Sequence, residues 1–203
     1  MEPMNFFADV KPASVLLAGP TQVPQSAQKA VATLLGIPEN SIRVELSKMG
    51  GGFGRRLSND YALEAAELSN IIKKPVLVMW TREDDMGGGT YRPAVRYHFK
   101  AGIDAQGNLT AFYLRGVGLN AGNSTRQDNF PVGAIDNVLI ESVDQKSAVT
   151  TGPWRAPITN FLGFAEQAFL DEVAEAAGKD PIQMRLDLLA RVKSNPVGKI
   201  TYE

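Results

Sequence analysis

The run Gly50-Gly51-Gly52-Phe53-Gly54 separates two segments of different periodicity, and it constrains the fold of this 203-residue chain more than any other feature. Before the run, residues 41–48 alternate apolar and polar side chains, which predicts a half-buried strand. After it, apolar side chains recur at helical spacing over residues 58–72, which predicts an amphipathic helix. Glycines at such a junction let the backbone take positive φ angles and approach a ligand closely.

Two interpretations of this glycine loop remain open from its residues. Backbone N–H groups exposed near a helix N-terminus favour an anion or an oxo group, and the guanidinium groups of Arg55 and Arg56 would add paired donors. A glycine run can also serve only close packing. A Walker A loop is excluded because no Gly-Lys-Ser/Thr follows, and a dinucleotide fingerprint fails because Arg55 stands where that motif needs glycine.

The remaining pattern interleaves strands and helices, with hairpins among them. Strands are predicted over 5–10, 14–18, 75–80, 95–103, 109–117 and 138–149, and further helices over 24–35, 159–177 and 181–189. The continuous apolar run of 75–80 is typical of a strand buried on both faces. Residues 84–90 are expected to form a glycine-rich turn, and residues 118–137 a long loop at which the sequence allows a change of subdomain. The chain is therefore predicted to be an α+β domain with mixed sheets and packed helices.

Composition excludes several kinds of chemistry. Lys and Arg total 21 and Asp and Glu total 22, a balance that argues against a nucleic-acid module or a polybasic membrane anchor. The chain has no cysteine, so it carries no disulfide, thiolate metal site, iron–sulfur cluster or cysteine nucleophile. It has a single histidine, which excludes multi-histidine metal sites. No apolar stretch is long enough to span a bilayer.

Other residues with reactive side chains have simple structural interpretations. His98 falls on the polar face of a predicted strand and is expected to be a solvated surface histidine. The acidic run Glu83-Asp84-Asp85 is expected to cap a turn. Glu166 and Asp171 are predicted to lie on the exposed side of their helix. Trp154-Arg155, held between two prolines, fits structural anchoring and ligand contact equally well.

Four motifs, in order along the chain, resemble the molybdenum-cofactor subunit of the xanthine dehydrogenase/aldehyde oxidase family. They are Met1-Glu2-Pro3, the segment around Met49-Gly50-Gly51-Gly52-Phe53-Gly54, the segment from Pro75 to Met86, and the segment from Thr151 to Gln167. The variants Gly-Gly-Gly-Phe-Gly-Arg-Arg and Pro-Trp-Arg-Ala-Pro are most similar to the isoquinoline 1-oxidoreductase β-subunit branch. The resemblance implies that residues 1–203 are part of a molybdopterin-binding domain, with a glycine loop at 49–56 and a second cofactor loop at 151–158.

The resemblance also implies an oxidoreductase activity and a set of site residues. The family hydroxylates an electron-poor carbon of an N-heterocycle or aldehyde with oxygen from water, and its electrons leave through iron–sulfur clusters. The residues implied to bind the molybdenum-pterin cofactor are Gly51, Gly52, Phe53, Gly54, Arg155 and Ala156, with the N–H groups of Gly52, Phe53 and Gly54 as donors to its oxo side. The residues implied to line the substrate pocket are Phe53, Leu57 and Trp154.

Departures from the family pattern define further expectations. Purine-oxidising members have a glutamate at the position of Leu57, so purine is not the expected substrate. The family's subunit is several times longer, and its general-base glutamate has no counterpart in this chain. We therefore expect a fragment that is inactive alone, contains no catalytic residue, and has the rest of the subunit and an iron–sulfur subunit as partners. Two alternatives remain, namely a non-catalytic anion- or partner-binding module and, ranked last, RNA binding through Gly-Phe-Gly-Arg-Arg.

Overall fold

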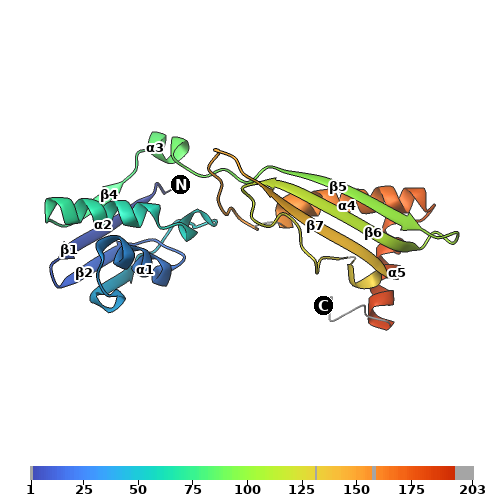
Figure 1. Ribbon diagram of the computed structural model, residues 1–203, viewed down its shortest axis with the longest axis horizontal. Helices are drawn as coiled ribbons and strands as arrows, with labels where there is room; N and C mark the ends of the chain where they lie inside the picture. The colour runs from blue at the N-terminus through green and yellow to red at the C-terminus, as the bar shows by residue number, and fades with distance from the viewer. Residues whose placement is uncertain (1, 131, 157–158, 195–203) are drawn as a thin grey trace. The chain divides into compact units, whose positions relative to one another are not determined.

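The computed structural model describes residues 2–130, 132–156 and 159–194 of the chain (Figure 1). The chain divides into two compact units, one formed by Met1–Arg92 with Gly152–Arg155 and the other by Pro93–Thr151 with Ala156–Glu203. The segment 118–137, at which the sequence allowed a change of subdomain, lies entirely within the second unit. Mixed sheets and packed helices occur in both units, which confirms the α+β class.

The first unit is built on a four-stranded sheet. Its strands are β1 (Asn5–Lys11), β2 (Ser14–Gly19), β3 (Ile42–Leu46) and β4 (Val76–Met79), in the order β3-β2-β1-β4. Strands β2 and β3 are parallel because helix α1 (Pro24–Leu35) carries the chain between them, and the other neighbours are antiparallel. Helix α2 (Asp60–Ile72) connects β3 to β4, as the sequence predicted.

Helices α1 and α2 both pack on one face of this sheet. Alternate side chains of β1 and β2, among them Phe6 and Leu17, are buried in one cluster with Val31 of α1 and Tyr61 of α2. The rings of Phe6 and Tyr61 meet edge to face with their centroids 5.5 Å apart. The alternating pattern of the strands and the helical pattern of α1 and α2 therefore mark the residues that face one shared core.

Strand β4 is an edge strand, and the prediction that it is buried on both faces was wrong. Its side chains alternate in exposure, with Leu77 64% and Met79 66% exposed. An apolar run by itself does not show whether a strand lies inside a sheet or at its edge.

The glycine-rich turn expected over 84–90 is partly a short helix, α3 (Arg82–Gly87). Thr81 Oγ1 accepts the Asp84 N–H at 3.1 Å, and the Asp84 carboxylate accepts the Thr81 N–H at 3.0 Å. This is a capping box, and the hydrogen bonds that the Asp84 carboxylate accepts from Thr81 lower the pKa of Asp84. The acidic run therefore has the predicted capping role, but the element that it caps is the start of helix α3.

The second unit packs two helices on a three-stranded sheet. The strands β5 (Val95–Ile103), β6 (Leu109–Leu119) and β7 (Asn137–Gln145) lie in that order, with β5 and β6 antiparallel and β6 and β7 parallel. A short 3-10 helix, η3 (Val132–Ala134), precedes β7. Helices α4 (Thr159–Ala176) and α5 (Pro181–Ser194) follow, and Phe99 of β5 stacks on Phe169 of α4 at 4.9 Å. The last helix is longer than the predicted 181–189, and residues 195–203 of the expected polar tail lie outside the described residues.

Glu166 is buried, so the prediction that it is a solvated charge was wrong. Its residue is only 3% exposed, and the Asn129 side-chain amide donates to its carboxylate at 2.8 Å. Burial raises the pKa of Glu166 to about 7. The chain between β6 and β7 covers this side of α4, which helical periodicity could not indicate. Asp171 on the same helix is exposed, as predicted, and pairs with Arg185 at 2.9 Å.

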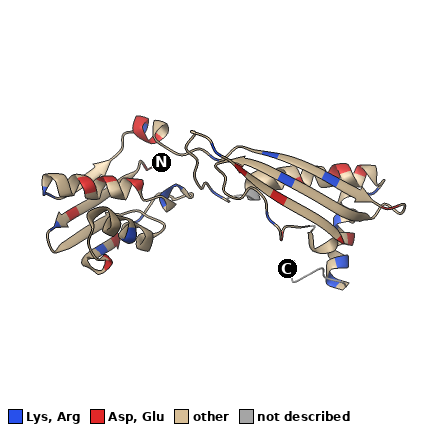
Figure 2. Ribbon diagram, viewed as in Figure 1, with Lys and Arg blue, Asp and Glu red and all other residues tan. Residues whose placement is uncertain are grey.

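The described helices do not include one with the length and hydropathy that a bilayer crossing requires. Basic and acidic side chains both occur in each unit (Figure 2). His98 is exposed on β5, where its ring lies edge-on to Tyr113.

Candidate functional site

The glycine loop between β3 and α2 adopts a backbone that side chains would obstruct. Gly51 and Gly54 have φ angles of 142° and 87°, and Phe53 takes a left-handed φ of 49°. A Cβ atom on Gly52 would lie 2.4 Å from the side chain of Gln22, and one on Gly54 would lie 2.8 Å from the carbonyl oxygen of Pro153. The glycines are therefore needed both for conformation and for close approach.

Three successive backbone N–H groups of this loop are open. The N–H groups of Gly51, Gly52 and Phe53 have no hydrogen-bond acceptor among the residues that the structure describes. At the two ends of this stretch, the Gly50 N–H donates to Glu2 at 2.6 Å and the Gly54 N–H donates to Gln22 at 3.0 Å. Consecutive N–H groups without an acceptor in the protein are typical of loops that bind anions and oxo groups.

The structure differs from the implied set of donors at Gly54, and it adds Gln22 to the residues of the site. Gly54 is held by the side-chain oxygen of Gln22, so its N–H is not open like those of Gly52 and Phe53. Gln22 was not among the site residues predicted from the sequence. Nothing in the local pattern marks Gln22, because its partner Gly54 lies on a distant turn of the chain.

The second loop, Gly152–Arg155, packs against the glycine loop within the first unit. The backbone N–H of Arg155 donates to the carbonyl oxygen of Phe53 at 2.9 Å, and the Arg155 guanidinium lies 5.8 Å from the centre of the Phe53 ring. The Gly152 N–H donates to the carbonyl oxygen of Tyr91 at 3.0 Å. Ala156, which takes a φ of 54°, is assigned to the second unit.

Two aromatic side chains of these loops are exposed. Phe53 and Trp154 are each 55% exposed, and the guanidinium of Arg92 lies 5.2 Å from the centre of the Trp154 ring. Arg92 also donates to the carbonyl oxygen of Arg155 at 3.4 Å. Leu57 ends the short 3-10 helix η2 (Arg55–Leu57) and is 38% exposed. The loops thus combine open backbone donors with apolar surfaces.

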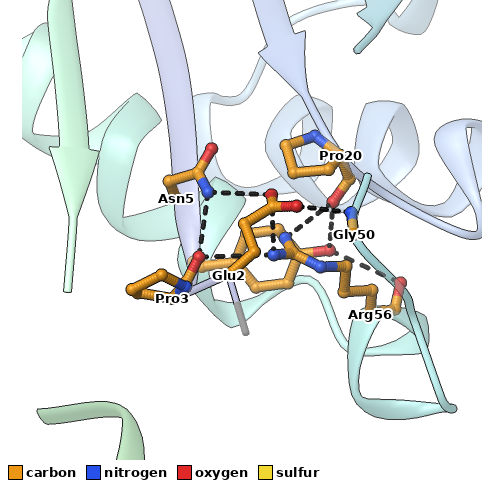
Figure 3. A network of polar contacts seen from close by, with 7 residues as sticks. Glu2, Pro3, Asn5, Pro20, Gly50 and Arg56 are labelled. Carbon is orange, nitrogen blue, oxygen red and sulfur yellow. Dashed lines mark hydrogen bonds and ion pairs between the residues drawn. The ribbon is translucent and has the colours of Figure 1, made fainter. Parts of the chain in front are cut away.

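Arg55 and Arg56 are not open anion-binding forks, contrary to the expectation from sequence. Arg55 makes a bidentate pair with Asp60 at 2.9 and 2.6 Å, which raises the pKa of its guanidinium. Arg56 is 1% exposed and donates to the carbonyl oxygen of Pro20 at 3.1 Å and to Glu2 at 3.0 Å (Figure 3). Both guanidinium groups hold the loop to its own unit.

Metal-ligating side chains do not gather in this site. Across residues 2–130, 132–156 and 159–194, no group of three or more His, Cys, Asp or Glu side chains has a metal-binding arrangement. The polar groups that the loops offer to a ligand therefore include the backbone amides and the exposed Arg155 side chain.

A family model described as "Molybdopterin cofactor-binding domain" matches residues 1–188. Among curated proteins, the chain is 28% identical to the isoquinoline 1-oxidoreductase subunit beta of Brevundimonas diminuta, over 88% of this chain and 24% of that protein. It is also 28% identical to a membrane-bound aldehyde dehydrogenase (pyrroloquinoline-quinone) of Gluconacetobacter polyoxogenes, over 93% of this chain and 27% of that protein. The chain thus spans about a quarter of the length of these relatives.

Solved structures share the fold. Quinoline 2-oxidoreductase from Pseudomonas putida 86 matches with a TM-score of 0.76 and 24% identity, over 98% of this chain and 26% of that one. Aldehyde oxidoreductase from Desulfovibrio gigas matches with a TM-score of 0.78 and 17% identity, over 91% of this chain and 22% of that one.

Proposed function

Because the chain belongs to the family of molybdopterin cofactor-binding domains, we propose that it forms part of the cofactor surface of a molybdenum hydroxylase that oxidises N-heterocycles or aldehydes. The observation that carries the proposal is the row of open N–H groups at Gly51, Gly52 and Phe53. These donors suit the oxygen atoms of an oxo-metal or phosphate group, and a Cβ at Gly51 or Gly52 would meet neighbouring side chains. The donor set therefore fits the cofactor that the family binds.

In the proposed role, the chain's own residues bind and orient the cofactor. When bound, the cofactor supplies a Lewis-acidic, redox-active metal that accepts electrons from the substrate. Gly51, Gly52 and Phe53 donate N–H groups to it, and the hydrogen bond from Arg155 to Phe53 keeps the second loop beside them. Glu2 and Gln22 hold the N–H groups on either side of these donors, which limits the reorganisation that binding requires.

The side chains around the loops favour a flat, apolar substrate. Phe53 and Trp154 present exposed rings on which an aromatic heterocycle can stack. Leu57 offers no hydrogen bond to the polar edge of a purine, which favours a less polar heterocycle or an aldehyde. An iron–sulfur subunit that takes up the electrons is the partner proposed for such a reaction.

A titration of the ¹⁵N-labelled chain with isolated molybdenum cofactor tests the proposal. We expect the amide resonances of Gly51, Gly52 and Phe53 to shift. We expect Gly52→Ala to weaken those shifts, because its Cβ would displace the Gln22 side chain that holds the Gly54 N–H. Gly36→Ala is a matched control, since Gly36 has a positive φ but a Cβ added there would meet no atom within 4 Å. Absence of shifts in the wild type contradicts the proposal. Equal shifts with inorganic phosphate support the anion-binding module instead.

A further inference from the structure

Glu2 connects the segment that precedes β1 to the glycine loop, which lies far away in the sequence. Its carboxylate accepts the Gly50 N–H at 2.6 Å, the Arg56 guanidinium at 3.0 Å and the side-chain amide of Asn5 at 3.1 Å (Figure 3). Glu2 precedes the first strand, whereas Gly50 and Arg56 lie at the two sides of the glycine loop. One carboxylate therefore holds the start of the chain to the start and the end of the loop.

The position of this carboxylate is strongly determined, because Arg56 is buried. Arg56 is 1% exposed, and besides Glu2 it donates to the carbonyl oxygens of Pro20 at 3.1 Å and Pro3 at 3.3 Å. Its guanidinium also lies 5.8 Å from the centre of the Tyr61 ring. A charge removed from water to this degree requires a paired anion, and Glu2 supplies it.

The contact with Gly50 acts on the loop itself rather than on the core. Glu2 holds the N–H that directly precedes the open donors, while Gln22 holds the N–H of Gly54 that directly follows them. The stretch from Gly51 to Phe53 is therefore fixed at both ends. Glycine at position 50 allows this approach, since a Cβ there would lie 3.2 Å from the Glu2 carboxylate.

We infer that Glu2 is a positioning residue, which fixes the start of the glycine loop so that the N–H groups of Gly51 to Phe53 face a bound cofactor. This inference rests on the proposed function for the identity of the ligand. The anchoring itself does not depend on that function, because it concerns contacts within the protein. The hydrogen bond from the Gly50 N–H lowers the pKa of Glu2, and the Asn5 hydrogen bond and the charge of Arg56 lower it further. The carboxylate therefore stays ionised at neutral pH.

The experiment separates anchoring of the loop from neutralisation of Arg56. Glu2→Ala removes both functions, so its unfolding alone would not distinguish them. The double variant Glu2→Ala/Arg56→Met also removes the buried charge, so we expect it to recover most of the lost stability without restoring the contact to Gly50. Glu45→Gln is the matched control, because the Glu45 side chain forms an exposed ion pair with Arg43.

Amide hydrogen exchange of the cofactor-free chain is the first measurement. We expect Gly50 and its neighbours in the glycine loop to exchange at least tenfold faster in the double variant than in the wild type, while the amides of β1 and α2 keep their protection. In Glu45→Gln, exchange in the loop is expected to be unchanged. If the double variant restores wild-type exchange at Gly50, then Glu2 serves only to neutralise Arg56 and the inference is overturned.

Affinity for isolated molybdenum cofactor is the second measurement, and we expect a loss of at least tenfold in the double variant. An unchanged affinity would overturn the positioning role even if exchange at Gly50 accelerates. If the wild type binds no cofactor, the proposed function and with it the positioning role fail, but the exchange measurement still decides whether Glu2 anchors the loop. The two failures are therefore distinguishable.

Discussion

The backbone N–H of Arg155 donates to the carbonyl oxygen of Phe53 at 2.9 Å and joins two loops from distant parts of the chain. The Arg155 guanidinium lies over the same Phe53 ring. The two segments that sequence similarity associates with cofactor binding are thus held together by the protein itself. Substitutions that disturb this contact are therefore expected to affect both loops.

Gly54→Ala is expected to disrupt the contact between the loops. Its Cβ would lie 2.8 Å from the carbonyl oxygen of Pro153, and alanine would also have to adopt the φ of 87°. Gly36→Ala imposes a similar φ penalty of about 1–2 kcal/mol without a collision. We expect Gly54→Ala to lower the free energy of unfolding by at least about 1 kcal/mol more than the control, as measured in urea. Equal losses would show that packing against Pro153 is unimportant.

Arg56→Met is expected to destabilise the first unit by on the order of 3 kcal/mol, because Glu2 loses its ion-pair partner and the carbonyl oxygen of Pro20 loses one of its donors. Arg43→Met is the matched control. Arg43 has a 78% exposed side chain in its pair with Glu45, so its loss is expected to cost less than about 0.5 kcal/mol. Chemical denaturation of both variants provides the comparison, and similar midpoints would contradict the structural role of Arg56.

The stability of the second unit is expected to fall as pH rises from about 4 to 7. The folded state keeps a proton on Glu166, whose pKa is raised to about 7, whereas an unfolded glutamate releases it near pH 4.3. Glu166→Gln keeps the shape and stays neutral, so it is expected to stabilise the fold above pH 7 by up to about 3 kcal/mol. Thermal unfolding between pH 4 and 8 measures this effect, and parallel pH profiles of the two proteins would refute it.

The anchor at Glu2 has the opposite pH dependence. Its pKa is lowered in the folded state, so its contribution is fully present above the unfolded value of about 4.3 and is lost as pH falls through the folded pKa. The Gly50 amide resonance is expected to move at a lower pH than the titration of an ordinary glutamate, whereas an amide outside the network such as that of Gly36 is not expected to follow it. A Gly50 shift that titrates near neutral pH would be inconsistent with this assignment.

Phe53→Ala is expected to affect ligand binding much more than folding. The ring is 55% exposed, so truncation is expected to change the free energy of unfolding by less than about 1 kcal/mol. Phe6→Ala, at a fully buried ring of the same type, is expected to cost about 3–5 kcal/mol. Urea unfolding of both variants and a cofactor titration of Phe53→Ala make the test. A large folding defect in Phe53→Ala would place this ring in the core instead.

Most of the fold followed from local pattern. The alternation around Ile42–Leu46 and the helical spacing of Asp60–Ile72 gave the right element types at nearly the right positions. The wrong predictions concern the burial of residues and not their secondary structure. The Val76–Met79 strand was placed inside a sheet but forms its edge, and Glu166 was placed in solvent but is buried under the segment that carries Asn129. Local periodicity describes which residues share a face, but not what covers that face.

By itself, the sequence determined the strand–glycine loop–helix unit, the α+β class and the resemblance to a molybdenum-cofactor domain, because these depend on residues that are neighbours in the chain. Only the tertiary structure decided which polar groups of the loop are open. In the folded chain, Arg56 is buried and Arg55 pairs with Asp60. The N–H of Gly50 donates to Glu2, and the N–H of Gly54 donates to Gln22. The physical reason is that burial and hydrogen bonding depend on partners far away in sequence, which only the folded chain brings together.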